Sequence, residues 1–201
     1  MPPSSPKGPR GRPRTVPTEA VLQCALESYW HGDPADVSVN AICQRAGVAK
    51  PSLYRAFGSE DGLMRAALQR YADEVLPDLF VIFDGGRDLQ GALSALLEFA
   101  TDDPRMATGC LFHKLRMHRH RLGPQTRAAV EAIEKQAEAC TTRFLQERLA
   151  AGDWQGGVSP AVGARYLFEQ LGLAIGLRAS GEDPRRVRAL FGLALSVFRQ
   201  P

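Results

Sequence analysis

The sequence predicts an all-α protein of about nine helices, with a small N-terminal domain of short helices followed by a larger helical C-terminal domain. Apolar residues recur at helical spacing along most of the 201-residue chain. Breaks such as Gly85-Gly86 and Gly123-Pro124 separate these segments by short connections. No segment has the strict alternation of apolar and polar residues that favours a half-buried strand. Together the three observations favour the all-α class.

The N-terminal helices are bounded by recognisable start and stop signals. The first is expected over residues 16–30, where the apolar residues follow helical spacing. Ser38 is expected to cap a short second helix that Gly47 ends. A third helix is expected over 50–57, with Pro51 tolerated in its first turn. Two short helices around a glycine turn form a helix-turn-helix.

The larger domain is expected to hold the remaining helices, which glycine and proline residues separate. They are expected at 59–76, 88–101, 105–120, 124–151, 159–180 and 184–200. Pro77 is expected to perturb the first of these helices after Leu76. The chain is therefore divided into a flexible basic arm at 1–14, a helix-turn-helix domain at 15–60 and a third part at 61–201.

The excess positive charge lies in the first third of the chain. Residues 1 to 70 hold nine Lys and Arg against six Asp and Glu, and the rest of the chain holds equal numbers of each. Arg10, Arg12 and Arg14 stand in a Pro- and Gly-rich arm without acidic residues. The arm resembles an AT-hook that enters an A·T minor groove. The alternative is a solvated basic tail that adds affinity for phosphate. Both interpretations indicate nucleic acid.

Composition and motifs exclude several other classes of protein. The longest apolar stretch is interrupted by Glu169 and Gln170, so no membrane span is expected, and the N-terminus does not read as a secretory signal. The cytoplasm is the expected location. The four cysteines form no CxxC pair, which argues against zinc fingers and against a disulfide framework. No metalloprotease, P-loop, nucleotide-turn or nucleophile-elbow motif occurs, so neither an enzyme nor a cofactor is expected.

The stretch from Ala46 to Ser59, AGVAKPSLYRAFGS, resembles the signature of the TetR family of bacterial regulators. The resemblance extends from Val21 to Leu68, whereas the C-terminal domain matches only in size and helicity. It implies that helix 50–57 enters the major groove of DNA. It also implies that Lys50 and Tyr54 contact phosphates and that Ser52 and Arg55 approach bases or backbone. Family members often carry a lysine at the start of the next helix, where this chain has Glu60 and Asp61.

Helical geometry agrees with these implied contacts. Leu53 and Phe57 are spaced i, i+4 and are expected to face the core. This spacing leaves the other residues of the helix on the outer side, where a recognition helix reads DNA. The complete set of expected DNA-binding residues is Arg10, Arg12, Arg14, Ser38, Lys50, Pro51, Ser52, Tyr54 and Arg55.

Helix 159–180 is apolar on nearly every side, which indicates that one face packs inside the subunit and another against a second copy. Helix 184–200 repeats the pattern. The expected dimer interface consists of Tyr166, Leu173, Leu177, Leu190, Leu193 and Val197. The alternative is that both helices belong to one ordinary core. A dimer places two recognition helices about 34 Å apart, which suits a palindromic site.

The segment Gly109-Cys110-Leu111 is similar to an element in some TetR relatives that use the cysteine to sense oxidants or electrophiles. Nearby Lys114 and Arg116 are expected to lower the pKa of the Cys110 thiol and raise its reactivity. The alternative is a buried structural cysteine. His113 could share a metal with Cys110, but the spacing of the other histidines fits a metal site poorly, and none is expected. The effector candidates are Cys110, His113, Met106, Phe112, Met117 and Tyr166.

Residues 61–201 are thus expected to bind an effector and to dimerise. The expected function is a dimeric transcriptional regulator, a repressor released from a palindromic double-stranded operator by a small-molecule or thiol-reactive effector. An architectural protein that binds A·T-rich DNA broadly is the competing class. The large, neutral C-terminal domain argues against it, because coating DNA does not require such a domain.

Overall fold

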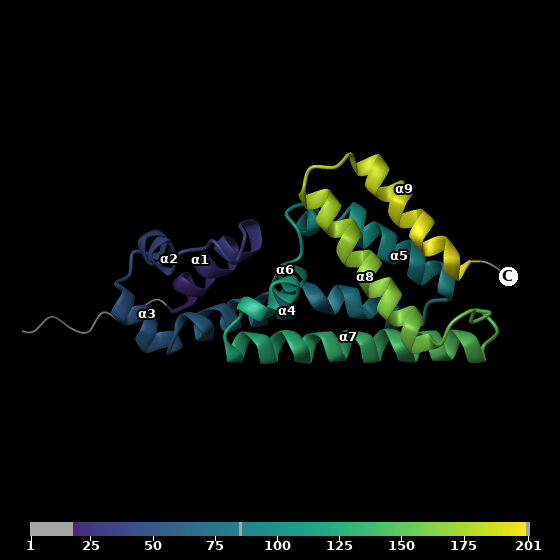
Figure 1. Cartoon of the computed structure of the whole chain (residues 1–201), viewed down its shortest axis with the longest axis horizontal. Coiled ribbons are helices and arrows are strands. Elements are labelled where there is room, and N and C mark those ends of the chain that lie inside the picture. The colour runs from purple at the N-terminus through teal and green to yellow at the C-terminus, as the bar shows by residue number, and fades with distance from the viewer. Residues whose placement is uncertain (1–17, 85, 200–201) are drawn as a thin grey trace, which may run out of the picture.

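The computed structural model describes residues 18–84 and 86–199, and all regular structure within these ranges is helical (Figure 1). The N-terminal helices are α1 (Thr18–His31), α2 (Val39–Ala46), α3 (Lys50–Phe57) and the long α4 (Glu60–Asp84). The other α-helices are α5 (Leu89–Thr101), α6 (Leu111–Met117), α7 (Pro124–Ala150), α8 (Pro160–Ala179) and α9 (Pro184–Leu195). Short 3-10 turns occupy Pro104–Met106, Arg119–Arg121 and Ser196–Phe198. The predicted all-α class is confirmed.

Local capping residues set the ends of α2 and α3 as predicted. The Ser38 hydroxyl accepts a hydrogen bond from the Asn40 amide at 3.2 Å. Gly47 ends α2 with a φ of 65°, a left-handed conformation that a side chain disfavours. Gly58 ends α3, and the Ser59 hydroxyl accepts from the Gly62 amide at 3.0 Å at the start of α4. The two hydrogen bonds thus define the starts of α2 and α4, and the left-handed Gly47 makes the turn between α2 and α3.

The predicted end of the fourth helix near Leu76 is wrong, because α4 continues through Pro77 to Asp84. Proline removes one backbone donor and crowds the preceding turn. Residues beyond it, including Leu79 and Ile82, are nevertheless buried in the core. Burial of this apolar face offsets the local cost of the proline and keeps the chain helical.

The single helix predicted over 105–120 is also wrong. The chain there forms a 3-10 turn, then α6, then a second 3-10 turn. Gly109 has a φ of 95°, and the Cys110 sulfur accepts the His113 amide at 3.4 Å as the cap of α6. At the C-terminus α9 stops at Leu195 and a 3-10 turn follows, so the predicted helix to residue 200 is too long.

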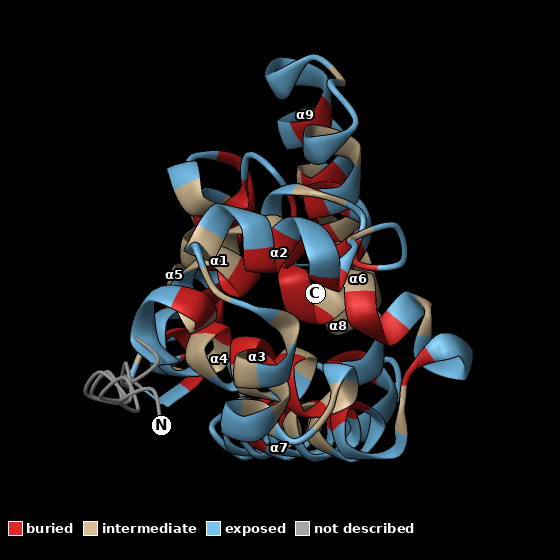
Figure 2. Cartoon of the chain, turned by 90° about the vertical axis from the view of Figure 1, so that its left-hand side faces the viewer, coloured by how far each residue is buried: buried red, intermediate tan, exposed pale blue. Residues whose placement is uncertain are grey.

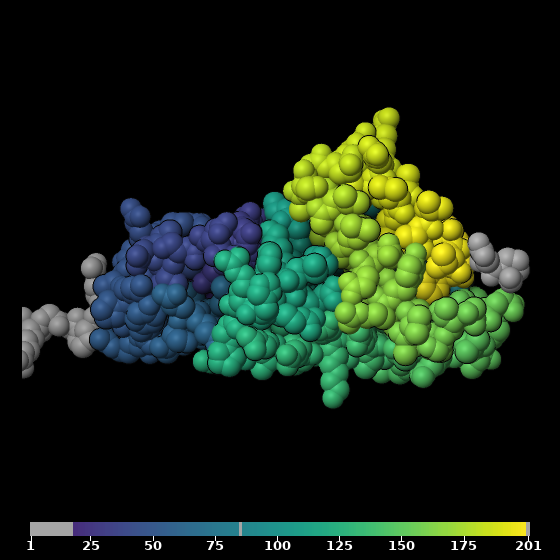
Figure 3. Space-filling view, viewed as in Figure 1, coloured from purple at the N-terminus to yellow at the C-terminus, as the bar shows by residue number. Residues whose placement is uncertain are grey.

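The helices are arranged as two bodies joined by long helices. At one end α1, α2 and α3 lie together beside the first turns of α4, and at the other end α5, α8 and α9 pack together (Figure 1). α4 and α7 pack along each other between the two ends. Figure 2 shows buried residues between the helices and exposed residues on the outward faces of α2 and α3. The two bodies are separated by a notch in the surface between the N-terminal helices and α8 (Figure 3). None of the described helices is long and apolar enough to span a membrane.

Candidate DNA-reading surface and effector chamber

The outer face of α3 carries the polar residues that the sequence singled out. Leu53 is fully buried and anchors the helix to the core. Pro51 and Arg55 are exposed, and Lys50, Ser52 and Tyr54 are half-buried. Ser38 is exposed at the start of α2. Arg10, Arg12 and Arg14 lie outside the described residues. The rigid turn between α2 and α3 therefore presents one polar helix face to solvent.

One carboxylate oxygen of Glu60 lies between two of these side chains. Glu60 Oε1 accepts a hydrogen bond from the Tyr54 hydroxyl at 2.8 Å and is 3.5 Å from Lys50 Nζ. The Lys50 ammonium is 5.6 Å from the centre of the Tyr54 ring. The pKa of Lys50 is raised, first by its interaction with the Tyr54 hydroxyl and further by Glu60. We call these three residues the reading cluster. In the sequence, Glu60 stood out only because it lies at the start of the helix where TetR family members often carry a lysine.

The neighbouring Asp61 binds the start of α7. Its carboxylate accepts from the amides of Gln125 and Thr126 at 2.8 and 3.0 Å and from the Thr126 hydroxyl at 2.6 Å. Burial alone would raise the pKa of Asp61, but these hydrogen bonds outweigh it and hold the pKa below its ordinary value. A Cβ on Gly123 would lie 2.4 Å from the Asp61 carboxyl carbon. Asp61 thus ties the first turn of α4 to α7.

A narrow apolar chamber lies inside the larger body between α4, α5, α6 and α8. It has a volume of about 30 Å³, enough for a water molecule. Its lining includes Tyr71, Cys110, Phe112, His113 and Phe168. Three effector candidates therefore meet in one place. Met106 is fully buried elsewhere in the core, and Tyr166 donates a hydrogen bond from α8 to the Ala194 carbonyl oxygen of α9.

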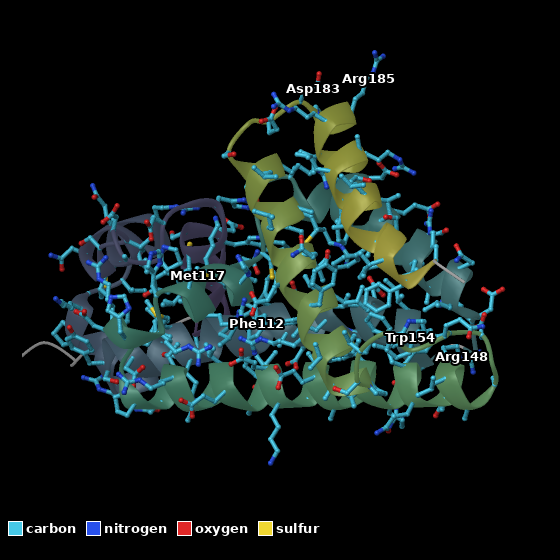
Figure 4. All side chains as sticks on the ribbon, turned by 45° about the vertical axis from the view of Figure 1, so that its right-hand side comes forward. Phe112, Met117, Arg148, Trp154, Asp183 and Arg185 are labelled. Carbon is cyan, nitrogen blue, oxygen red and sulfur yellow. The ribbon has the colours of Figure 1, made fainter. Side chains whose placement is uncertain are left out.

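The chamber adjoins an open groove of about 580 Å³ between the end of α1 and α8. Cys110 and His113 line both spaces. Met117 lines only the groove, where it is 59% exposed, and Phe112 is buried inside the bundle (Figure 4). The Lys114 ammonium donates to the carbonyl oxygens of Trp30 and Gly32 across the groove. These contacts connect α6 to the N-terminal helices.

The polar groups of the chamber are held in their neutral forms. Burial raises the pKa of the Cys110 thiol and outweighs the opposing effect of Lys114, so the expected lowering of this pKa is wrong. Burial also lowers the pKa of His113, and Arg116 lowers it further. The fully buried Tyr71 hydroxyl lies beside the thiol and makes no hydrogen bond of normal geometry within the described residues. Burial raises its pKa as well.

A buried ionic cluster stands behind the chamber and connects α6, α7 and α8. Arg116, with a side chain only 4% exposed, lies 3.2 Å from Glu134 and donates to Glu169 at 2.5 Å. Arg119 and Arg165 approach Glu134 at 3.0 and 2.9 Å. The pKa of Glu169 is lowered, chiefly by its hydrogen bond from Arg116. We call these five residues the buried cluster after Arg116 and Glu134; the side chains of Glu169, Arg119 and Arg165 around them are 40, 44 and 45% exposed.

Two apolar stripes are exposed on α8 and α9. Leu173 is 55% and Leu193 is 70% exposed, and Leu190 and Val197 are also exposed. Leu177 and Tyr166 are half-buried on α8. The hydrogen bond from the Tyr166 hydroxyl to the Ala194 carbonyl oxygen joins the two neighbouring helices. Of the predicted interface residues, four are therefore exposed and two are half-buried.

Comparisons with known proteins match both the N-terminal domain and the whole fold. Residues 21–67 match the model of the family described as bacterial regulatory proteins, tetR family. The HTH-type transcriptional repressor ComR of Escherichia coli strain K12 is 24% identical over 198 residues, which cover 96% of this chain and 92% of that protein.

Solved structures extend the likeness to the C-terminal domain. A regulatory protein TetR from Rhodobacter sphaeroides has a TM-score of 0.76 at 21% identity, covering 90% of this chain and 97% of the other. A cysteine mutant of the TetR family regulator CifR, solved with 26 bp double-strand operator DNA, has a TM-score of 0.75 at 24% identity. That match covers 93% of this chain and all of the other, so the likeness of fold includes both bodies.

Proposed function

Because the chain belongs to the TetR family of bacterial regulators, a class of DNA-binding proteins and not of enzymes, we propose that it is a dimeric repressor that reads a palindromic operator with α3. The observation that carries this proposal is the polar outer face of α3. The buried Leu53 holds the helix, and Lys50, Tyr54 and Arg55 are available at the surface. An α-helix fits the major groove, where an arginine can read a guanine edge.

The remaining candidate residues have supporting roles in this proposal. Ser52 and Pro51 lie beside the reading residues on α3, and Ser38 stands at the start of α2. The arginines of the arm at 1–14 add contacts to phosphates or to the minor groove. The helix-turn-helix domain comprises residues 15–60, and binding to chromosomal DNA places the protein in the cytoplasm.

The proposed dimer is formed by the apolar surface of α8 and α9. Large exposed apolar residues on neighbouring helices are unusual in a monomer and are typical of an interface. A two-fold axis through such a surface pairs the same residues of both subunits. To read a palindrome, this dimer must hold its two copies of α3 about one DNA turn apart. The repressor role is supported by the similarity to ComR, an HTH-type transcriptional repressor.

The proposed effector is a small neutral molecule that enters by the groove and enlarges the chamber. The chamber walls are mostly apolar, and their polar groups are the uncharged Tyr71, Cys110 and His113. An ionic ligand would find no opposite charge there. The Tyr71 hydroxyl, which lies beside the Cys110 thiol without a hydrogen bond of normal geometry, is available to a polar atom of the ligand. The buried, protonated thiol favours this non-covalent effector over a thiol-reactive one.

Selection from a random-sequence duplex library tests the proposed function. Wild-type protein is expected to enrich a palindromic motif, and Arg55→Ala, which removes a base-reading side chain, is expected to lose it. Tyr54→Ala, which removes a phosphate contact, is expected to bind all duplexes more weakly. Arg185→Ala removes one exposed charge from the start of α9 and is the matched control. Absence of any enriched motif, or its full retention in Arg55→Ala, would overturn the proposal in favour of broad, architectural binding.

A further inference from the structure

The reading cluster contains an anion that belongs to the protein itself. The Tyr54 hydroxyl and the Lys50 ammonium, which the family resemblance assigns to phosphate contacts, both approach the same oxygen, Glu60 Oε1. A phosphate oxygen of a bound duplex would accept hydrogen bonds from the same two donors. The carboxylate of Glu60 therefore stands where the geometry of these donors accommodates an oxyanion.

We propose that Glu60 is an internal competitor for an operator phosphate, so that the protein binds DNA only by replacing this carboxylate at the Tyr54 and Lys50 side chains. This inference rests on the proposed function, since it concerns the same surface. It assigns to Glu60 a role in setting the affinity for DNA, whereas sequence preference stays with the base-reading residues. Phosphates carry no base identity, so competition at this position acts on operator and non-operator DNA alike.

The exposure of the cluster makes such an exchange feasible. The side chains of Glu60 and Lys50 are 57% and 41% exposed. Ion pairs with this exposure contribute little to the stability of a fold and re-form readily with other partners. Asp61, one residue further on, is held by three hydrogen bonds from α7 and fixes the backbone of this turn. The Glu60 side chain can therefore swing away without disturbing α4.

Removal of the charge at position 60 is expected to tighten binding. Glu60→Gln keeps the side-chain shape but removes the repulsion between the carboxylate and a phosphate a few ångströms away, which corresponds to about tenfold tighter binding per half-site. Glu60→Lys, which adds a positive charge, is expected to tighten binding further. Each variant is also expected to steepen the dependence of affinity on salt by about one counterion per half-site.

The control is Asp73→Asn, which makes the same charge change on the same helix. Asp73 is exposed and stands thirteen residues beyond Glu60, about 20 Å along α4. Its variant is expected to leave the affinity within about twofold of wild type, because exposed charges at this distance are screened. Thermal melting of each variant checks that its fold is intact.

Fluorescence anisotropy of the selected duplex and of a scrambled duplex measures the effect. Glu60→Gln is expected to bind both duplexes about 100-fold more tightly, about tenfold for each of the two half-sites, with the ratio of the two affinities unchanged. In the Tyr54→Phe background, Glu60→Gln is expected to gain clearly less, because one of the shared donors is gone. Equal or weaker binding by both Glu60→Gln and Glu60→Lys would overturn the competitor role, and would make Glu60 a residue that positions Tyr54.

The same titrations separate this inference from the proposed function. If wild-type protein prefers its selected duplex but the Glu60 variants bind no tighter, only the competitor role fails. If wild-type protein prefers no duplex over the scrambled one, the operator-reading function fails and the competitor role fails with it.

Discussion

The reading cluster and the buried cluster are built from the same kinds of side chains but differ in the burial of the central ion pair, because Arg116 and Glu134 are buried whereas Lys50 and Glu60 are exposed. In the reading cluster, Glu60 and Lys50 are about half-exposed, so water, salt ions or a phosphate can replace either partner. In the buried cluster, Arg116 is only 4% exposed and bridges two carboxylates on separate helices. A buried charge cannot lose its partner without a large cost. The comparison shows that burial decides whether a charged group holds the fold or remains free to meet a ligand.

The largest expected effect is on the buried cluster. Arg116→Ala removes the buried cation that bridges the two carboxylates and packs on the Phe168 ring, so that Glu134 and Glu169 keep only the half-exposed Arg119 and Arg165. It is expected to lower the free energy of unfolding by about 3 kcal/mol. Arg119→Ala is the control, because Arg119 approaches the same Glu134 with a side chain that is 44% exposed. Arg119→Ala is expected to lower the free energy of unfolding by about 1 kcal/mol or less. Urea denaturation measures both, and equal losses would contradict the distinction drawn from burial.

The next largest effect on stability is expected at the contact between the first turn of α4 and the start of α7. Asp61→Ala removes the cap of α7 and is expected to lower the free energy of unfolding by about 2 kcal/mol. Because the folded protein holds the pKa of Asp61 below its ordinary value of 3.8, this contribution is complete above that pH and is lost as the pH falls through the folded pKa. Urea titrations at several pH values should show the wild-type advantage shrinking in acid. An advantage that grows in acid would refute this role.

A smaller effect of opposite sign is expected in the chamber. The Tyr71 hydroxyl is buried without a hydrogen bond of normal geometry, so Tyr71→Phe is expected to raise the free energy of unfolding by about 1 kcal/mol. Tyr29→Phe removes the hydroxyl of another buried tyrosine, and its change in the free energy of unfolding provides the comparison. A clear loss of stability in Tyr71→Phe would show that the hydroxyl is already satisfied in the protein, and would remove the basis for its contact with an effector.

The smallest effect on stability is expected at Glu60, where the expected effect on DNA binding is large. Glu60→Gln is expected to change the free energy of unfolding by no more than about 0.5 kcal/mol, because the pairs it breaks are exposed. Urea denaturation at low salt is the measurement. A loss of unfolding free energy comparable to that of Arg116→Ala would show that Glu60 stabilises the fold, and would contradict the difference drawn between the two clusters.

The parts of the fold that follow from neighbouring residues were predictable from sequence. Ser38 and Gly47 determine α2 through contacts within a few residues, and the i, i+4 pair at 53 and 57 sets the orientation of α3. Pro77 shows the limit of such reasoning, because packing of the following residues, which the sequence pattern did not weigh, overrides a local helix breaker.

The candidate site divides in the same way. The polar face of α3 was predictable, but the roles of Asp61 and Glu134 were not, because their partners stand far away in the sequence. Cys110 gives the clearest case. The sequence left a thiol activated by cationic neighbours and a buried structural cysteine as alternatives. The fold turns Arg116 toward Glu134 and Glu169, and burial raises the pKa of the thiol, which favours the second alternative.

The most direct test of the account is the ratio of affinities for the selected palindrome and a scrambled duplex of equal length, measured at one salt concentration. Wild-type protein is expected to prefer the palindrome by at least about 10³-fold. Arg55→Ala is expected to reduce this ratio by about tenfold or more, as for loss of a base contact, while Arg185→Ala leaves it unchanged. A ratio near one for wild-type protein, or an unchanged ratio for Arg55→Ala, would contradict the claim that α3 reads an operator.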